Sequence, residues 1–419
     1  MPQLYARSAM LAASDRSVRR LVRPTAAQLG RLPTRYCAEV KPGGHLLLAP
    51  DKFKGSLSAA AVARHLQVGI HRVVPETDLR LVPVADGGEG TVEAAVAAGF
   101  RRISASVTGS LGEPVLADIA VRGHTAVVEL AQANGLELTG RSARRPLLAS
   151  SFGTGEMIRR ALDLGCRTIV LGVGGSDTTD GGAGMVSALG ARLSDVSGEP
   201  NPGGGAALRQ LHQLSIEGLD PRLAATTVVV ACDVDNPLLG PQGAASVFAP
   251  QKGALPAEVL VLEEGLRRWS HEVSAVVGRD WSTTAGAGAA GGVAFAALAM
   301  LGAQLRPGIE VMLEMSQFTE LLGGARLVVT GEGSLDEQSL GGKVPVGVAR
   351  AAVSAGTPVV AVAGRTTLSA AVLRAAGFAG AYTLQELEPD LERCMADAGV
   401  LVEQLGQRIA QDWLLPPPD

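Results

Sequence analysis

The chain has few aromatic residues and no excess of positive charge. Phe, Trp and Tyr make up 3% of its 419 residues, and the formal net charge at pH 7 is −4. Proteins that bind nucleic acids usually carry a basic surface and, for single strands, aromatic side chains on which the bases stack. We therefore expect no nucleic-acid partner.

Cysteine, histidine and long apolar runs are also scarce. The cysteines are widely spaced, and the six histidines form no HExxH or other paired spacing. This argues against a disulfide framework or a zinc ligand set. No apolar run reaches the roughly 18 residues that a membrane-spanning helix needs. These absences predict a cytoplasmic protein with no membrane partner.

Residues 1–43 differ from the rest of the chain. Their charged residues are mainly arginine, with Asp15 and Glu39 as the only acids. An Arg-rich, acid-poor N-terminus is typical of an organellar transit peptide. The simpler interpretation, which we favour, is a disordered extension.

Lysine is rare, and its positions are informative. Of 37 basic residues only five are lysines, and four of these lie in Gly- or Pro-rich turns: Lys52, Lys54, Lys252 and Lys343. An ammonium is a compact point charge, whereas a guanidinium is a planar fork. Lysine kept beside flexible backbone indicates binding to phosphate oxygens. The alternative is chance survival of a few surface lysines.

Apolar strands, Gly-rich turns and amphipathic helices alternate along much of the chain. This pattern predicts parallel sheets covered by helices on both faces, with ligands bound beyond the carboxyl ends of the strands. The expected strands are His45–Ala49, Leu79–Val84, Thr168–Val173, Thr226–Ala231, Leu327–Thr330 and Pro358–Ala363. The expected helices run from Ser56 or Ser58 to Val73 and over Thr91–Ala98, Ala183–Leu189, Val344–Val353 and Leu368–Ala375.

The middle of the chain is less regular. Residues 100–160 contain short alternating segments, typical of a mixed or antiparallel sheet. The Gly/Ala-rich stretch 283–301 is a candidate hinge. We therefore predict an extension over 1–43, a discontinuous α/β domain over 44–98 plus 290–405, and an inserted α/β domain over 99–289, with a cleft between the two domains.

Two turns near the N-terminal end combine charge with helix starts. In PDKFKGSLS, Lys54 and Ser56 precede a helix N-terminus, which suits an anion, although an ordinary capped turn has the same sequence. In ADGGEGT, Asp86 and Glu89 could hold Mg²⁺ or orient a hydroxyl. The alternative is a turn in which Asp86 accepts from its own backbone.

Two further turns belong to the middle of the chain. In ASSFGTGEMI, the residues Ser151, Thr154 and Gly155 precede a helix and could bind a carboxylate or phosphate, or could simply cap it. In GVGGSDTTDGGAGM, the many glycines permit close approach of the backbone to a ligand. Asp177 and Asp180 there could divide the roles of metal ligand and base.

The last two motifs combine carboxylates with lysine. ACDVDNP supplies Asp233, Asp235 and Asn236, with Lys252 downstream, and TGEGSLDEQSLGGKVP supplies a second such set. Its members are Glu332, Asp336, Gln338 and Lys343. Anion donors, hard-metal carboxylates and lysines are what phosphoryl transfer requires, because its catalysis is mostly positioning and charge neutralisation.

From residue 46 to about 405 these motifs, in this order, resemble the bacterial glycerate kinase family, the type that includes the glycerate 2-kinases. The segments LLLAPDKFKGSLSA, VPVADGGEGTVEA, FAPQKGA and GAAGGVAFA extend the likeness. The resemblance implies a discontinuous flavodoxin-like three-layer domain with an inserted second α/β domain. It also implies phosphorylation of D-glycerate by ATP with Mg²⁺, usually to 2-phosphoglycerate and in some members to the 3-phospho product. The family usually has Ala where this chain has Asp177, which favours Asp180 as the catalytic carboxylate.

On this basis we expect Asp180 to be the base, Lys54 and Lys343 to neutralise phosphates or the substrate carboxylate, and the active site to lie in the interdomain cleft. The expected metal ligands are Asp86, Asp233 and Asp235. The expected substrate- or phosphate-binding residues are Ser56, Ser151, Thr154, Gly155, Gly181, Glu332, Asp336, Gln338 and Lys252. The expected partners are D-glycerate and ATP, and we allow for a homodimer.

Two rival interpretations are a glycerate-binding sensor and a nicotinamide dehydrogenase. A dehydrogenase would carry a GxGxxG signature after its first strand, and this chain has none there.

Overall fold

The protein is described by a computed structural model covering residues 44–140 and 144–416. The expectations for residues 1–43 lie outside the described residues. None of the described helices is both long enough and apolar enough to cross a membrane.

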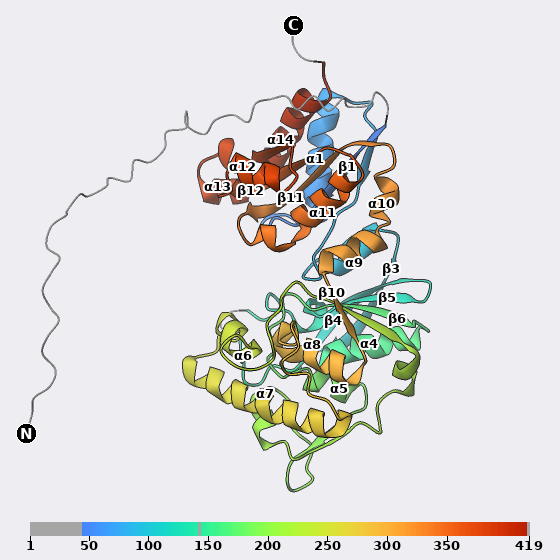
Figure 1. Cartoon of the computed structure of the whole chain (residues 1–419), viewed down its shortest axis with the longest axis vertical. Coiled ribbons are helices and arrows are strands. Elements are labelled where there is room, and N and C mark those ends of the chain that lie inside the picture. Colours follow the sequence, from blue (N-terminus) through green and yellow to red (C-terminus); the bar gives the residue numbers. More distant parts are fainter. Residues whose placement is uncertain (1–43, 141–143, 417–419) are drawn as a thin grey trace, which may run out of the picture. The chain divides into compact units, whose positions relative to one another are not determined.

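The first sheet is wholly parallel and draws its strands from both ends of the described chain (Figure 1). Its spatial order is β13-β12-β11-β1-β2. Its strands are β1 (His45–Pro50), β2 (Leu79–Leu81), β11 (Ala325–Leu335), β12 (Val359–Thr366) and β13 (Gly380–Thr383). Renumbered within this sheet the order is 2-1-3-4-5, which is the flavodoxin-like order. The expected discontinuous flavodoxin-like fold is therefore confirmed.

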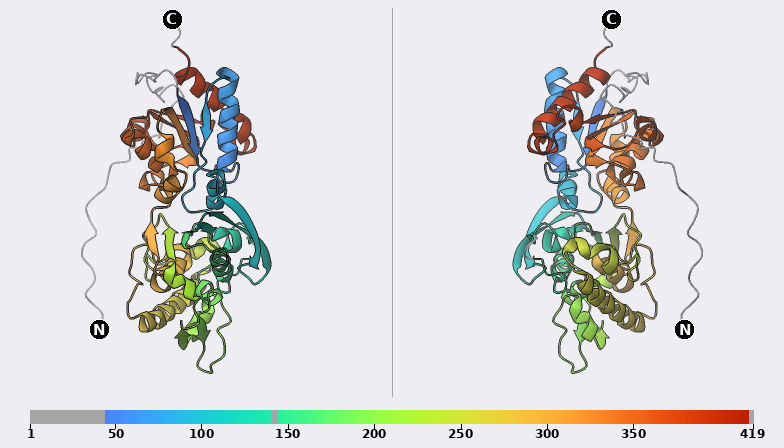
Figure 2. Two further views of the ribbon diagram at one scale, coloured as in Figure 1. Left: turned by 90° about the vertical axis from the view of Figure 1, so that its right-hand side faces the viewer. Right: turned by 90° about the vertical axis from the view of Figure 1, so that its left-hand side faces the viewer.

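Helices cover both faces of this sheet because its strands are apolar on both sides. Leu46 and Leu48 pack with α1 and α14, whereas Leu47 and Ala49 point to the opposite face. Figure 2 shows α1 and α14 side by side. Ser58 begins α1 by accepting a hydrogen bond from the backbone N–H of Ala61. The helices of this part are α1 (Ala59–Val73), α2 (Thr91–Ala97), α9 (Gly308–Met315), α10 (Phe318–Leu321), α11 (Val344–Ser354), α12 (Ala370–Ala375), α13 (Leu391–Ala396) and α14 (Ala398–Trp413).

The second sheet is mixed, as the alternating segments predicted. Its order is β10-β9-β6-β5-β4-β3, with antiparallel pairing among β3, β4 and β5 and parallel pairing in the rest. Its strands are β3 (Arg101–Thr108), β4 (Pro114–Arg122), β5 (Thr125–Glu129), β6 (Thr168–Gly172), β9 (Thr227–Ala231) and β10 (Gln304–Arg306), and β7 (Arg192–Ser194) pairs separately with β8 (Gln213–Ser215). Its helices are α3 (Ala131–Asn134), α4 (Phe152–Asp163), α5 (Ala183–Ala188), α6 (Ala244–Phe248), α7 (Pro256–Val277) and α8 (Ala289–Met300).

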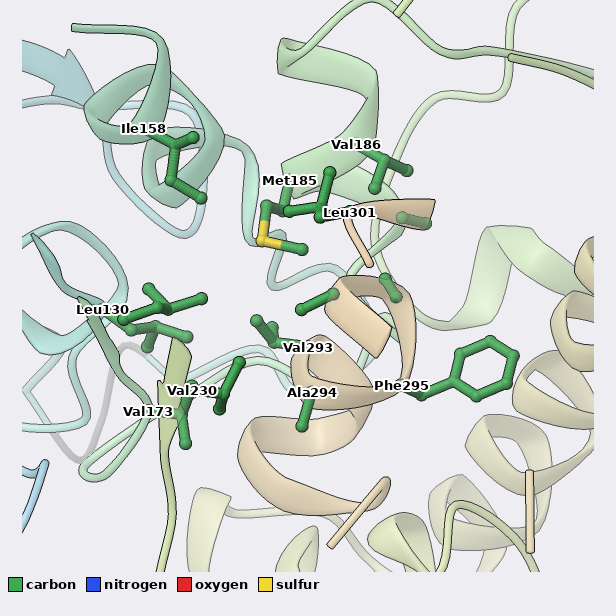
Figure 3. Packing of buried hydrophobic residues seen from close by; sticks show 14 of the residues in the cluster. Leu130, Ile158, Val173, Met185, Val186, Val230, Val293, Ala294, Phe295 and Leu301 are labelled. Atoms are coloured by element: carbon green, nitrogen blue, oxygen red, sulfur yellow. The ribbon is translucent and has the colours of Figure 1, made fainter. Parts of the chain in front are cut away.

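The helix α8 belongs with the second sheet, contrary to the boundary expected at residue 290. Val293 and Phe295 on α8 are fully buried in one apolar cluster with Met185 and Val230 (Figure 3). The next strand, β10, pairs with β9 of the same sheet. We therefore propose that the chain returns to the first domain after Arg306. The Gly/Ala-rich stretch 283–301, which we expected to be a hinge, instead contributes to this tightly packed core.

Candidate active site

The candidate site lies where the strand order of the first sheet reverses, between β1 and β11. Ligands of open α/β sheets bind at such a switch point, beyond the carboxyl ends of the strands. Asp51 follows β1 directly, and its backbone N–H donates to the carbonyl of Gly331 on β11 at 2.8 Å. Glu332 is the next residue of β11 and is 9% exposed. The topology thus brings two carboxyl groups to the switch point.

Asp86 joins this pair from the glycine-rich turn after β2. Its Oδ1 accepts a hydrogen bond from the N–H of Gly88 at 3.2 Å, the local turn that the sequence allowed. The turn also lies against glycines from elsewhere. A Cβ on Gly174 would come within 2.6 Å of Gly88 Cα, and one on Gly308 within 1.8 Å of the Asp86 carbonyl oxygen. Only glycine permits these backbone contacts.

The carboxyl groups at the switch point repel one another. Burial, together with the charges of Asp86 and Glu332, raises the pKa of Asp51 to about 7 against the opposing effect of Lys52. Burial also raises the pKa of Glu332, with Asp336 and Asp86 adding to the effect. Ionisation of these carboxyl groups therefore lowers the stability of the folded protein, and a bound cation would offset this loss.

Four cationic side chains line the same region. Lys52 donates to the backbone carbonyl of Glu89 and lies 3.6 Å from the Glu89 carboxylate. Lys54 is exposed, and Lys343 is near enough to Glu332 to lower the pKa of that carboxyl. Arg365, at the end of β12, donates from Nε to Ser334 Oγ at 3.3 Å. Cations and carboxylates thus alternate around one space.

That space consists of two adjoining pockets. The larger, of about 520 Å³, is lined by Asp86, Gly174, Glu332, Asp336, Lys343 and Arg365, among others. The smaller, of about 330 Å³, is lined by Ser58, Val84, Glu93 and Glu137, among others. The residues common to both pockets are Asp51, Lys52, Phe53, Lys54, Ser56 and Glu89. Asp51 therefore stands at the junction, with access to whatever occupies either pocket.

The donor atoms at the junction fit a hard divalent cation. Glu332 Oε1 is buried and has no hydrogen-bond partner among the described residues. In residues 44–140 and 144–416 no three Asp, Glu, His or Cys side chains converge as a ready-made metal cage. Mg²⁺ does not need one, because it is commonly held by one or two carboxylates together with substrate phosphates and water. Asp86 and Glu332 are the carboxylates best placed for it.

Asp180, which we expected to be the base, lies outside this space. Its side chain is fully buried and lines neither pocket. It accepts hydrogen bonds from the Ser151 backbone N–H and hydroxyl at 2.8 and 2.9 Å, and from the N–H groups of Gly182 and Gly184 at 3.0 and 3.1 Å. A carboxylate with four donors and no solvent contact joins the turn before α5 to the start of α4.

The neighbouring expected binding residues are also buried and already bonded within the protein. Ser151 and Thr154 are fully buried, and both the N–H and the hydroxyl of Thr154 donate to Asn134 Oδ1. A Cβ on Gly155 would lie 2.2 Å from the Met185 carbonyl oxygen, and one on Gly181 would lie 2.4 Å from Trp269 Cδ1. These glycines allow helix and indole packing, with no opening for a ligand.

Lys252 is likewise buried, at 3% exposure. It donates to Ser176 Oγ and to the Thr178 carbonyl. Burial lowers its pKa to about 8 despite the opposing charges of Asp177 and Asp180. Asp177 accepts hydrogen bonds from Ser110 and Thr139. The densest glycine motif of the sequence therefore forms an internal polar network, and its residues Gly174 and Gly175 are the part that reaches the larger pocket.

The remaining predicted residues divide between the pocket and the surface. Asp233 Oδ1 accepts from the Gly308 N–H at 2.8 Å, and partial burial raises its pKa to about 6, with Asp86 contributing. Asp235 and Gln338 are exposed and line neither pocket. Asp336 lines the larger pocket while its Oδ1 accepts from the Gln338 N–H at 3.0 Å.

Two further residues of the site, Asp51 and Arg365, were not predicted from the sequence. Asp51 is the first residue after a buried strand. Because two lysines follow it, we interpreted that turn as an anion site and did not single out the carboxyl group. Arg365 is the next-to-last residue of β12, which lies beside β11 in the sheet. Its signal would have been its position after an apolar strand, since arginine itself is common in this chain.

The fold and site define a class: an α/β protein with a switch-point pocket in which carboxylates alternate with lysines, as enzymes that act on phosphates require. The chain belongs to the glycerate kinase family, whose profile matches residues 46–414. It is 45% identical over 343 residues to the glycerate 2-kinase of Escherichia coli (strain K12), covering 81% of this chain and 90% of that one. It is 42% identical to the glycerate kinase of Halalkalibacterium halodurans, covering 87% of this chain and 97% of that one. A crystal structure from Salmonella typhimurium LT2, described provisionally as glycerate kinase 2, matches with a TM-score of 0.76 and 43% identity over 88% of this chain and 98% of that chain.

Proposed function

We propose that the protein transfers the γ-phosphoryl group of ATP to a hydroxyl of D-glycerate, with 2-phosphoglycerate as the favoured product and Mg²⁺ as the metal. The observation that supports this most is the pair of adjoining pockets with Asp51 at their junction. Two substrates must meet in such a reaction, and one group must reach the atoms that react.

The larger pocket suits the nucleotide, and the smaller suits the three-carbon acid. Lys54 and Ser56 belong to both pockets and would contact phosphate oxygens or the glycerate carboxylate where the substrates meet. Lys343 lines only the larger pocket and would neutralise the polyphosphate. Glycerate in the smaller pocket would then present its hydroxyl toward Asp51.

Asp51 takes the role of base in this proposal, in place of Asp180. It accepts the hydroxyl proton while the glycerate oxygen bonds to the γ-phosphorus and the bond from that phosphorus to the β–γ bridging oxygen breaks, so ADP leaves with the electron pair. A base with a pKa near the working pH combines the correct protonation state with a useful driving force. The Lys52 N–H, which donates to Asp51 Oδ1 at 2.7 Å, holds the carboxylate in one orientation.

Asp86 and Glu332 would hold Mg²⁺, and Asp86 is close enough to Asp233 to raise the pKa of that carboxyl. When bound, the metal neutralises the charge of the phosphates and positions the transferring group. Its binding would relieve the repulsion among the switch-point carboxylates. Asp235, which is exposed, has no part in this arrangement.

The test is a coupled assay with ATP, Mg²⁺ and D-glycerate, with the product then offered directly to enolase. Conversion by enolase would establish 2-phosphoglycerate. ADP formation without direct use by enolase would instead point to the 3-phospho product. Absence of glycerate-dependent ADP formation, with the folded state verified by circular dichroism, would reject the kinase.

A further inference from the structure

The wall of the larger pocket on the side of α13 is apolar. Leu391 and Met395 are one helical turn apart on this helix and remain 55% and 45% exposed. Leu384 and Cys394, which line the same wall, are buried at 2% and 4% exposure. Leu384 and Cys394 thus form the buried part of this wall, and Leu391 and Met395 are its solvent-exposed part.

This wall adjoins the lysine turn. A Cβ placed on Gly55 would lie 3.1 Å from Met395 Cε, so the methionine tip rests against the turn that carries Lys54. The same pocket is also lined by the cations Lys54, Lys343 and Arg365. The lining therefore suits a ligand that is apolar and broad at one end and carries anionic groups for these cations at the other.

ATP has this division, because its purine ring is flat and largely apolar on its faces and its triphosphate is strongly anionic. We infer that Leu391 and Met395 form the platform for the purine ring of the nucleotide, whose phosphates then run past Lys54 toward Lys343. This inference rests on the proposed function, since it assumes that a nucleotide is the co-substrate. The pocket volume of about 520 Å³ lies in the range of sites for ligands of this size.

The platform explains why two large apolar side chains stay exposed on a six-residue helix. Scattered apolar residues on a surface are normal. Here, however, both line a pocket, and Met395 lies against the turn expected to bind phosphate. Burial under a purine would remove their surface from water, and the thioether of Met395 is well suited to contact an aromatic ring.

The test is the double variant Leu391→Gln, Met395→Gln, which keeps the net charge and, at Met395, the side-chain length. We expect the KM for ATP to rise about tenfold or more, since the free energy of burying two apolar side chains is lost, while the KM for glycerate is unchanged. Inhibition by adenosine should weaken in parallel, and inhibition by inorganic tripolyphosphate should not. The matched control is Val400→Gln, an exposed residue on α14 outside both pockets, which should leave all four constants unchanged.

An unchanged KM for ATP in the double variant would overturn the platform, as would an equal loss of tripolyphosphate and adenosine inhibition. The proposed function can fail separately, if the wild-type protein forms no glycerate-dependent ADP. Calorimetry with a non-hydrolysable ATP analogue then decides the inference. Binding by wild type and its loss in the double variant would support the platform, and equal binding or no binding to wild type would reject it.

Discussion

In the proposed mechanism, Asp51 serves as the base at a cost in folding stability. Its folded-state pKa of about 7 lies above the ordinary value of 3.8 because of burial and of Asp86. The folded protein therefore binds this proton more tightly than the unfolded chain. The associated stability is complete below pH 3.8 and is lost as pH rises through about 7.

Replacing Asp51 by Asn should separate activity from stability. We expect kcat to fall by about 100-fold or more, since the base is gone. We also expect the free energy of unfolding at pH 8 to rise by about 2 kcal/mol, because each pKa unit corresponds to about 1.4 kcal/mol and partial exposure reduces the effect. Urea unfolding from pH 4 to pH 8 should show this gain growing up to about pH 7. A destabilised variant, or one with normal turnover, would contradict the assignment.

The same base predicts the pH dependence of the wild-type rate. Turnover should decline on the acid side as Asp51 is protonated, with a midpoint at or below about 7, since a bound cation lowers the pKa. A kcat profile measured with saturating ATP, Mg²⁺ and glycerate checks this. A rate that is flat down to pH 5 would exclude Asp51 as the base.

Asp180→Asn should behave in the opposite way. An amide places an NH₂ group against backbone N–H donors inside a dry turn, so we expect a loss of stability on the order of 3 kcal/mol. The kcat of the folded fraction should fall far less than in Asp51→Asn. Differential scanning calorimetry together with single-turnover kinetics would measure both quantities. Intact stability with abolished turnover would restore Asp180 as the base.

These residues show how much of the candidate site could be predicted from the sequence. Lys54, Asp86, Glu332 and Lys343 were singled out from sequence and do line the larger pocket. Asp180 was singled out for the same features, glycines and acids before a helix. A buried turn that satisfies its own backbone donors and a turn that binds a ligand use the same residue types. Only the tertiary packing, which puts Ser151 beside Asp180, separates them.

At the scale of elements, α8 contains an unusual backbone segment. Ala290 has φ of +52°, followed by Gly291 and Gly292 at +64° and +95°. The left-handed region suits the two glycines but is unfavourable for alanine. This segment fits closely against the Asp180 turn, and the Gly181 N–H donates to the Gly291 carbonyl at 2.9 Å.

Ala290→Gly should therefore stabilise the protein by roughly 0.5–1 kcal/mol, since the relief of strain exceeds the added freedom of the unfolded chain. Ala299→Gly, within the regular part of α8, is the matched control and should destabilise it by about 1 kcal/mol. Chemical denaturation of the two variants measures both effects. A destabilised Ala290→Gly would mean that the strain is absent.

Many strands of both sheets were predictable because each is an apolar run followed by a glycine-rich or polar turn. The strands β1, β6, β9 and β12 lie within a few residues of their expected ranges. The strand β10 and the helix α13 were not predicted. Each is short, and its placement depends on neighbours distant in the sequence, such as β9 for β10.

At the scale of the whole molecule, the two sheets share part of their core. One apolar cluster contains Leu47 and Val328 of the first sheet together with Val127 and Val229 of the second. Neither sheet can lose its structure without exposing the apolar surface of the other. Such coupling favours cooperative unfolding.

We therefore expect one calorimetric unfolding transition, although the chain forms two sheets. The measured enthalpy should agree with the van't Hoff enthalpy if unfolding is two-state. ATP with Mg²⁺ should shift the whole transition upward, since ligands that bind the folded state stabilise it. Two separate transitions, only one of them raised by nucleotide, would show that the shared cluster does not couple the sheets.

The glycine contacts around Asp86 bear on how such an enzyme could diverge. Gly174 and Gly308 have no side chain that could contact a ligand. Any side chain at either position would nevertheless displace the loop that carries Asp86. Substitutions on the pocket walls, by contrast, leave the backbone in place. A lineage that acquires a new acceptor would be expected to keep its glycines unchanged and to vary the walls.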